Sequence, residues 1–442
     1  MSTFHLVSLG CAKNLVDSEV MLGLLGKAGW EMVEDPRDAS VLLVNTCGFI
    51  QPAVEEAVEV ILEMGVYKKD DPSRFLVVTG CLVQRYKKEL EDELQEVDLF
   101  VGTEGVGEIV KYLDSLLQDG VEEKTILPDR FLMDATYTRT LSTPFFRSSV
   151  KITEGCNNRC TYCMIPAIRG NLRSRQIDDI IIELEGLEAG GLKELSLIAQ
   201  DLTAYGNDLG DETNLLNLLN TILRRTSIPW IRLMYLYPSG VTDDLLGLMQ
   251  SSRRILPYMD VPFQHVSDSV LQRMHRRYNY SDLYRFIERV RRVVPDIALR
   301  TTMMVGFPGE TEEDIRQMEQ FLQEYKLDHV GVFSYTNEEG ALSEFYQEQC
   351  PEEVKDERRS RILTLQAEIS EKILQKYVGK TVPVLVEGLS RETDLLLEGR
   401  SIYQAPEIDG CVLVTDGIAD PGNIVRVQII EAQIYDLVGE IV

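Results

Sequence analysis

The sequence predicts an α/β protein made of three successive parts: an N-terminal parallel α/β sheet domain, a central partial (β/α)6 barrel and a small C-terminal antiparallel β-barrel. In the first two parts, short apolar runs alternate with helical patterns, and this order is typical of parallel sheets. In the last part, short β-rich runs are separated by Gly, Pro and Asp, which is typical of a small barrel. A chain of 442 residues that is 44% hydrophobic is long enough for two or three cores.

The N-terminal domain is expected to span residues 1–125. Its apolar runs are of the kind that forms strands buried on both faces, at residues 4–9, 40–45, 74–79 and 97–101. Helical patterns follow these runs at residues 17–28, 51–64, 84–95 and 105–117. Because strands and helices alternate, the sheet is expected to be parallel.

The central barrel is expected to span residues 141–375, after a polar, turn-rich linker at residues 118–147. Six strand-like runs occur in this part, at residues 148–153, 194–198, 230–235, 258–261, 299–305 and 329–335. In such a barrel the chemistry takes place at the carboxyl ends of the strands. A charged amphipathic helix over residues 352–377 then leads to the C-terminal barrel, expected at residues 376–442.

Composition limits the classes of function. The chain has no run of about 18 apolar residues, and its first twenty residues lack the order of a secretion signal. We therefore expect a cytoplasmic protein, in which cysteines are more often ligands than disulfides. Its net charge of −27 repels nucleic acid at long range and attracts basic partners.

Three thiols, those of Cys156, Cys160 and Cys163, occur within eight residues in the pattern CxxxCxxC. A zinc site would need a fourth soft or imidazole ligand, but the stretch has no His, and the four histidines of the chain form no HxxxH pair. Three thiolates instead suit an iron–sulfur cluster with one iron left open. The alternative is a cysteine-rich loop without a cofactor.

A second set of thiols follows three successive predicted strands. Cys11, Cys47 and Cys81 end the segments LGC, NTC and TGC. Since the carboxyl ends of parallel strands lie along one edge of a sheet, these thiols can converge. We interpret them as a second three-thiolate site rather than unconnected core cysteines, and we expect Cys350 and Cys411 to be structural.

The first cysteine motif, with Tyr162 directly before the third cysteine, resembles that of the radical S-adenosylmethionine enzymes. The resemblance implies that a 4Fe–4S cluster binds S-adenosylmethionine and that one electron cleaves it to a 5'-deoxyadenosyl radical. It also implies cofactor contacts in the strand-end loops. Besides Tyr162, the candidates are Gln200, Gln264 and Gly306, which could equally be ordinary turn residues, and Arg300, for which a structural ion pair is the alternative.

Other arginines are candidates for binding. Arg169, Arg173 and Arg175 follow the cysteine motif and could hold the substrate. The arginine-rich segment 273–292 is either a solvated helix face or a contact for phosphate or an acidic partner.

The chain as a whole resembles the methylthiotransferases, through SLGCAKNLVDSE at Ser8, VNTCGFI at Val44, VTGCLVQRY at Val78, IPAIRGNLRSR at Ile165, VPFQHVSDSVLQRMHR at Val261 and YTNEEG at Tyr335. The resemblance implies two 4Fe–4S clusters, the second held by Cys11, Cys47 and Cys81, and a C-terminal barrel of the TRAM or OB type. It also implies two S-adenosylmethionine molecules per turnover, one for the methyl group and one for the radical.

One branch of that family modifies an adenosine of transfer RNA, and another modifies an aspartate of ribosomal protein uS12. The quoted segments resemble the second branch. The C-terminal barrel also favours it, because residues 378–442 contain four basic and eleven acidic residues, a net charge of −7, whereas a domain that binds RNA should be basic. We therefore expect a basic protein substrate that docks on this barrel, an external one-electron donor such as flavodoxin or ferredoxin, and no membrane or direct nucleic-acid partner. The alternatives are a transfer RNA methylthiotransferase and a non-catalytic iron–sulfur electron carrier.

Overall fold

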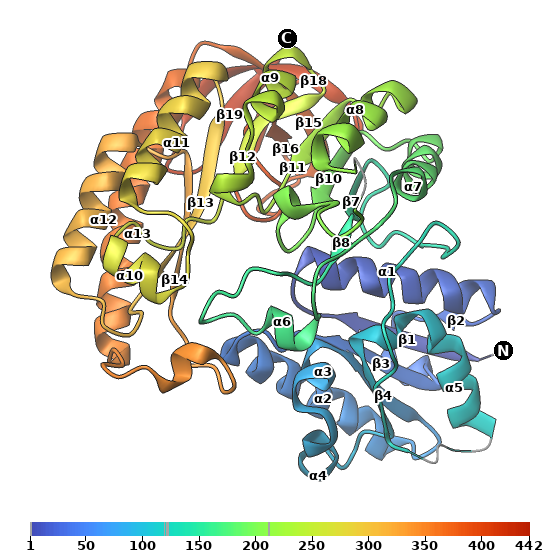
Figure 1. Ribbon diagram of the computed structural model, residues 1–442. Helices are drawn as coiled ribbons and strands as arrows, with labels where there is room; N and C mark the ends of the chain where they lie inside the picture. The colour runs from blue at the N-terminus through green and yellow to red at the C-terminus, as the bar shows by residue number, and fades with distance from the viewer. Residues whose placement is uncertain (1, 119, 121–122, 211–212) are drawn as a thin grey trace.

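The computed structural model describes residues 2–118, 120, 123–210 and 213–442. Figure 1 shows the N-terminal domain below the central barrel and the C-terminal barrel behind its upper part. The first sheet is parallel throughout, with the strand order β2-β1-β3-β4-β5-β6. Its strands are β1 (Thr3–Ser8), β2 (Glu31–Met32), β3 (Val41–Thr46), β4 (Phe75–Gly80), β5 (Leu99–Gly102) and β6 (Thr125–Ile126).

Helices cover both faces of this sheet. One face packs against α1 (Ala12–Lys27) and α5 (Ile109–Gln118), which follows the 3-10 helix η3 (Thr103–Glu108). The other packs against α2 (Gln51–Asp70), α3 (Cys81–Tyr86) and α4 (Leu90–Glu93). Because the sheet is covered on both sides, all six residues of β3 are buried. The predicted helix at residues 84–95 is wrong as a single element: Lys87 has a φ of 54°, and the helix breaks there.

The central sheet is also parallel, with the order β14-β13-β12-β11-β10-β7. All six predicted strands are present, as β7 (Arg147–Lys151), β10 (Glu194–Ile198), β11 (Trp230–Leu233), β12 (Ile255–Asp260), β13 (Ala298–Val305) and β14 (His329–Ser334). The helices that separate these strands pack on the sheet through a large apolar core. They are α7 (Ile177–Ala189), α8 (Leu215–Arg225), α9 (Asp243–Ser251), α10 (Asp268–Arg273), α11 (Tyr280–Val293) and α12 (Glu312–Tyr325).

The segment predicted as a linker is tied to both neighbouring domains. Its strand β6 pairs in parallel with β5 and so extends the first sheet. Further along, Arg139 forms ion pairs with Glu19 of α1 and Glu183 of α7, and the backbone N–H of Ser142 donates to Glu19 at 2.9 Å. Apart from β6, the described part of this segment is largely irregular, as its polar sequence predicts, and these contacts tie it to both domains; residues 119, 121 and 122 lie outside the described part.

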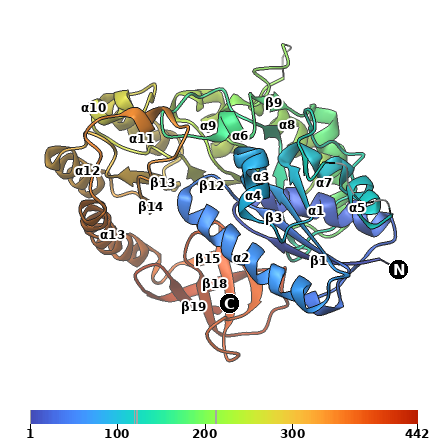
Figure 2. The ribbon, with the colours of Figure 1, turned by 90° about the horizontal axis from the view of Figure 1, so that it is seen from below.

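The C-terminal part is a closed barrel in the order β15-β16-β17-β19-β18. Its strands are β15 (Thr381–Leu389), β16 (Leu397–Ser401), β17 (Val412–Asp416), β18 (Ile424–Ala432) and β19 (Leu437–Ile441). The prediction of an antiparallel barrel is confirmed for four of its pairs, but β17 and β19 run parallel. Figure 2 shows helix α13 (Glu352–Leu374) leading to this barrel from the central one.

The C-terminal barrel and the N-terminal domain meet opposite ends of the central strands. Glu194 and His329, the first residues of β10 and β14, contact Arg400 and Tyr403 of the C-terminal barrel. Lys151, the last residue of β7, pairs instead with Asp17 of α1. The carboxyl ends of the central strands therefore face the N-terminal domain. Among the described residues, no helix is long and apolar enough to cross a membrane.

Candidate functional site

The cysteines at residues 11, 47 and 81 lie at one edge of the first sheet. They follow β1, β3 and β4, which are neighbours in the strand order. Gly10 has a φ of +89°, and a Cβ on it would lie 2.6 Å from Cβ of Cys47. This close approach of the two loops requires glycine and brings Cys11 towards Cys47. Cys81 begins α3 and is only 7% exposed.

Charge and burial differ among these three thiols. Burial raises the pKa of Cys47 to about 11, and burial also raises the pKa of Cys81. Cys11 is exposed: desolvation opposes its ionisation, but the charges of Lys13 and Arg169 lower its pKa overall. Thiolates at these positions therefore need compensation by a bound cation and by nearby basic groups.

The cysteines at residues 156, 160 and 163 lie in one irregular loop, between β8 (Thr153–Glu154) and α6 (Ile165–Ile168). Gly155 has a φ of +71°, and a Cβ there would lie 2.2 Å from the carbonyl oxygen of Asn171, so the turn into the loop requires glycine. Arg276 Nη1 donates to Sγ of Cys160 at 3.6 Å. Burial and the neighbouring Cys160 raise the pKa of Cys163 to about 12.

Thiols, which both sets supply, are the ligands that hold the irons of iron–sulfur clusters. Within the described part of the chain, no group of three or more His, Cys, Asp or Glu side chains is arranged to hold one metal ion. Thiols that bind different irons of a cluster are farther apart than ligands of one ion, and none of the eight cysteines is in a disulfide. Each set supplies three thiols, and the described residues add no His, Asp or Glu to complete a site for one metal ion.

The two sets of cysteines are close neighbours. Cys81 packs in one small cluster with Met164 and Ile168, which follow Cys163 in the chain. Arg169, directly after α6, also reaches this set: its Nη2 donates to Sγ of Cys81 at 3.4 Å. The packing of α3 on α6 therefore places the second site directly beside the first.

Buried charges surround Arg169. Its Nη1 is 2.8 Å from Asp17 of α1 and 3.2 Å from Glu154, and Lys151 pairs with both carboxylates. Burial opposes the ionisation of Glu154, but the charges of Lys151 and Arg169 lower its pKa to about 2. This network joins the N-terminal domain to the barrel. Sequence reasoning missed it, although Lys151 at the end of an apolar strand is a charged residue where burial is expected.

The predicted cofactor contacts lie at the carboxyl ends of the central strands. Gln200 follows β10, Gln264 follows β12, and Gly306 follows β13. The backbone N–H of Gln264 donates to Thr302, and its carbonyl oxygen accepts from the N–H of Met304. The half-buried side chain of Gln264 is therefore the part that is available to a ligand. Gly306 donates its N–H to Glu310 at 2.8 Å.

Tyr162 is half-buried in the cysteine loop and packs edge-on against Phe307, with ring centroids 6.4 Å apart. Burial raises its pKa well above the usual range, so the phenol stays neutral. The side chain of Asp201, next to Gln200, accepts from Asn158 of the cysteine loop at 2.7 Å. This bond ties the loop to the end of β10.

Four arginines considered as ligand contacts already have carboxylate partners. Arg300 is 3.0 Å from Asp260 and 3.4 Å from Asp409 of the C-terminal barrel, so of the two roles considered for it the contacts support the structural ion pair. The expectation that Arg169, Arg173 and Arg175 hold the substrate is likewise not supported. Arg173 binds Glu104, and Arg175 binds two acids of α7.

Comparison with known families divides the chain as the fold does. Residues 3–102 match the family described as uncharacterized protein family UPF0004. Residues 150–322 match the radical SAM superfamily, and residues 378–442 match the TRAM domain.

Among solved structures, the radical S-adenosylmethionine methyltransferase TsrM from Kitasatospora setae aligns with a TM-score of 0.55 and 17% identity over 75% of this chain and 73% of its own. The cobalamin-dependent S-adenosylmethionine radical enzyme OxsB aligns with a TM-score of 0.53 and 10% identity over 83% of this chain and 56% of its own. At these identities the two structures support the fold alone.

Full-length relatives are much more similar. A protein from Desulfotalea psychrophila is 58% identical over 99% of both chains, and one from Geobacter sulfurreducens is 44% identical over 99% of this chain and 98% of its own. Both are named ribosomal protein uS12 methylthiotransferase RimO. The resemblance and the predicted fold class are thus confirmed, and the chain belongs to the RimO family of radical S-adenosylmethionine methylthiotransferases.

Proposed function

We propose that this chain inserts a methylthio group at the β-carbon of an aspartate in ribosomal protein uS12. Relatives that match over the whole chain are named for activity on that protein. The structural observation that supports the proposal most directly is the contact between Cys81 and the segment that follows Cys163. Activation of a C–H bond and delivery of sulfur require two adjacent sites, and the two sets of thiols are adjacent.

Each set of thiols has its own role in this proposal. Cys156, Cys160 and Cys163 hold a 4Fe–4S cluster with one iron open to S-adenosylmethionine, and Cys11, Cys47 and Cys81 hold a second 4Fe–4S cluster. When bound, the first supplies the electron that cleaves S-adenosylmethionine, and the second supplies a position for the sulfur. The corresponding domains are residues 1–125, 141–375 and 376–442.

Residues of the chain would hold these groups and set their charge. Arg169 and Arg276 place guanidinium groups against Sγ of Cys81 and Cys160 and so offset the negative charge of the thiolates. Lys13, beside Cys11, is 6% exposed, and its ammonium lies 3.4 Å from the ring centroid of Tyr235 at the end of β11.

S-adenosylmethionine is proposed to bind between the cysteine loop and the strand ends. In this arrangement Tyr162, Gln200, Gln264 and Gly306 line the cofactor. Arg300 is left out, because its two carboxylate partners hold it at the C-terminal barrel.

The proposed docking surface for uS12 is one end of the C-terminal barrel. The loop between β15 and β16 and the loop between β17 and β18 lie at the same end, because β15 and β17 both finish there. Exposed acids in these loops surround two strongly exposed apolar side chains, Leu395 (88%) and Ile418 (97%). Acidic and apolar groups together suit a basic protein rather than RNA. We call this set the acidic end: Glu392, Asp394, Leu395, Asp416, Ile418 and Asp420.

The remaining partners follow from this proposal. Ribosomal proteins are made in the cytoplasm, so we place the reaction there. Each radical event consumes one electron, so an external one-electron donor such as flavodoxin or ferredoxin is needed. No direct contact with nucleic acid is required.

The test is anaerobic reconstitution with iron and sulfide, followed by incubation with S-adenosylmethionine and dithionite. Purified uS12 and transfer RNA are supplied in separate reactions and analysed by mass spectrometry. We expect a methylthio group on an aspartate of uS12 and an unmodified RNA. Modification of the RNA alone would contradict the proposed substrate.

The roles of the two cysteine sets are separable by substitution. Alanine at residues 11, 47 and 81 together should leave 5'-deoxyadenosine formation intact, abolish methylthiolation and remove about half of the bound iron. Alanine at residues 156, 160 and 163 should abolish both reactions. Loss of 5'-deoxyadenosine formation in the first variant would show that the sites do not act separately.

Docking is tested by charge reversal at the acidic end. Asp416→Lys with Asp420→Lys should weaken uS12 binding about tenfold at low salt, and less at high salt, because two attractions become repulsions. Asp92→Lys with Glu93→Lys, in exposed α4 of the N-terminal domain, makes the same change of charge elsewhere. Equal binding by both variants would contradict the assignment of this surface.

A further inference from the structure

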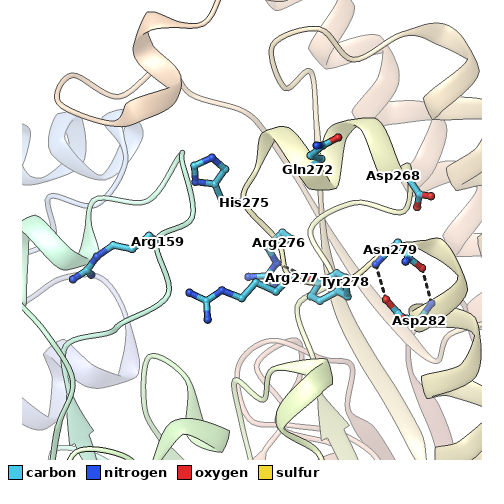
Figure 3. A pocket seen from close by; sticks show the side chains of 9 residues that line it. All are labelled: Arg159, Asp268, Gln272, His275, Arg276, Arg277, Tyr278, Asn279 and Asp282. Atoms are coloured by element: carbon cyan, nitrogen blue, oxygen red, sulfur yellow. Dashed lines mark hydrogen bonds between the residues drawn. The ribbon is translucent and has the colours of Figure 1, made fainter.

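A basic pocket opens beside the loop that carries Cys156, Cys160 and Cys163. Its volume is about 580 Å³, and it lies between this loop and the segment that joins α10 to α11. Figure 3 shows Arg159 on the cysteine loop and the consecutive residues His275, Arg276 and Arg277 across from it. The proposed function gives no role to this pocket.

One residue of the pocket reaches a cysteine directly. Arg276 donates to Sγ of Cys160 at 3.6 Å and to the carbonyl oxygen of Pro262 at 2.5 Å. The rings of Tyr237 and Tyr278 flank its guanidinium, with centroids 4.5 and 5.1 Å away. The inner wall of the pocket is therefore a fixed side chain in contact with a proposed ligand of the first cluster.

The lining of the pocket holds three arginines and two acids, and the acids lie on the side of the pocket away from Arg159. Asp268 accepts from the N–H of Tyr280 at 2.7 Å, and Asp282 accepts from the N–H of Asn279 at 3.1 Å, so both carboxylates are engaged at the start of α11. The guanidinium of Arg277 is exposed and has no hydrogen bond or ion pair with any described residue. Arg159 is also exposed.

This concentration of positive charge contrasts with the rest of the chain, which has a net charge of −27. An acidic protein would be repelled by most of the surface and attracted here, so the local charge selects where it docks. A basic substrate would be repelled here and attracted to the acidic end. The two faces therefore suit two partners of opposite charge.

We propose that the basic pocket docks an acidic one-electron carrier protein, which reduces the cluster held by Cys156, Cys160 and Cys163. The proposal rests on the proposed function and adds the place where the electron enters. The reduced carrier loses one electron, the cluster gains one, and no bond forms or breaks in this step. Arg276 links the docking face to Cys160, and Arg277 and Arg159 contact the carrier's carboxylates.

Arg277→Glu is the principal test, because the side chain has no structural partner to lose. The full-length variant is titrated with an acidic ferredoxin by calorimetry, and 5'-deoxyadenosine formation by the reconstituted enzyme is measured with reduced ferredoxin and, separately, with dithionite. We expect ferredoxin binding about tenfold weaker at low salt, since an attraction becomes a repulsion, and a smaller difference at 0.5 M salt. Activity driven by ferredoxin should fall at subsaturating ferredoxin, while activity driven by dithionite should stay within about twofold.

Arg253→Glu is the matched control, because Arg253 is another exposed arginine whose side chain has no hydrogen bond or ion pair with any described residue, and it lies before β12, at the amino end of the central strands. It should leave ferredoxin binding unchanged. Unchanged binding in Arg277→Glu, or an equal loss in both variants, would overturn the proposal. If Arg277→Glu lost duplex RNA binding but kept ferredoxin binding, the pocket would be a phosphate site. That result would also overturn the proposal. Methylthiolation with dithionite tests the proposed function independently of these outcomes.

Discussion

Glu194→Gln is expected to lower the free energy of unfolding by about 3 to 5 kcal/mol at pH 7, because it leaves buried cations without their counter-charge. Glu194 begins β10 and is 1% exposed. It binds Arg232 at 2.8 Å and Arg400 of the C-terminal barrel at 2.5 Å. In the variant Arg400 would keep only Glu387, at 2.8 Å, and Arg232 would have no carboxylate partner among the described residues.

The pKa of Glu194 supports this magnitude. Burial opposes its ionisation, but Arg400 and Arg232 lower the pKa from 4.5 to about 2, a difference that corresponds to about 3 kcal/mol. Because the pKa is lowered on folding, the stabilisation is fully present above pH 4.5 and is lost as the pH falls towards 2. The difference between wild type and variant should therefore be about 1 kcal/mol smaller at pH 4 than at pH 7.

Equilibrium urea unfolding followed by circular dichroism at both pH values measures this difference. Glu387→Gln is the matched control: it also removes a carboxylate from Arg400, but Glu194 remains, so we expect a loss of only about 1 kcal/mol. Equal losses in the two variants, or a difference that does not shrink at pH 4, would refute the assignment of a buried carboxylate shared by two arginines.

Two further substitutions test the architecture around the cysteines. Arg169→Met should lower the free energy of unfolding by about 3 kcal/mol, because the buried carboxylates of Asp17 and Glu154 would then share Lys151 alone. Thermal unfolding measures this loss. Adding Asp17→Asn should recover part of the lost stability, and no recovery would contradict the network. Gly10→Ala should lower the free energy of unfolding by about 2 kcal/mol and lower the iron content after reconstitution. The reason is that Gly10 has a φ of +89° and that the added Cβ would clash with Cys47. Gly26→Ala, whose Cβ would meet nothing within 4 Å in α1, should instead be neutral or stabilising, and equal behaviour of the two glycine variants would refute the close approach.

Much of the fold could be predicted because its signals are local. Strands buried on both faces, such as β3 and β10, appear as short apolar runs wherever they lie in the chain. The prediction was poorest where local signals are weak. The helix break at Lys87 depends on a left-handed residue that is not glycine, and β6 is only two residues long.

The candidate site was predictable to the same extent. Cysteines that follow successive parallel strands must lie at one sheet edge, so the positions of Cys11, Cys47 and Cys81 followed from the strand pattern alone. The spacing of the other three indicated their common role without any fold. Arg276 was not singled out, because nothing in an arginine-rich segment shows which guanidinium turns inward to Cys160.

The sequence alone determined the order of the elements and the placement of six cysteines, because hydrophobic period and strand ends are properties of neighbouring residues. Only the tertiary structure decided what the charged side chains do. Arg169 meets Asp17 and Arg300 meets Asp409, across 152 and 109 positions of the chain. Ion pairs depend on which surfaces pack together, and any of the 72 acidic residues could have been the partner until the three domains were in place.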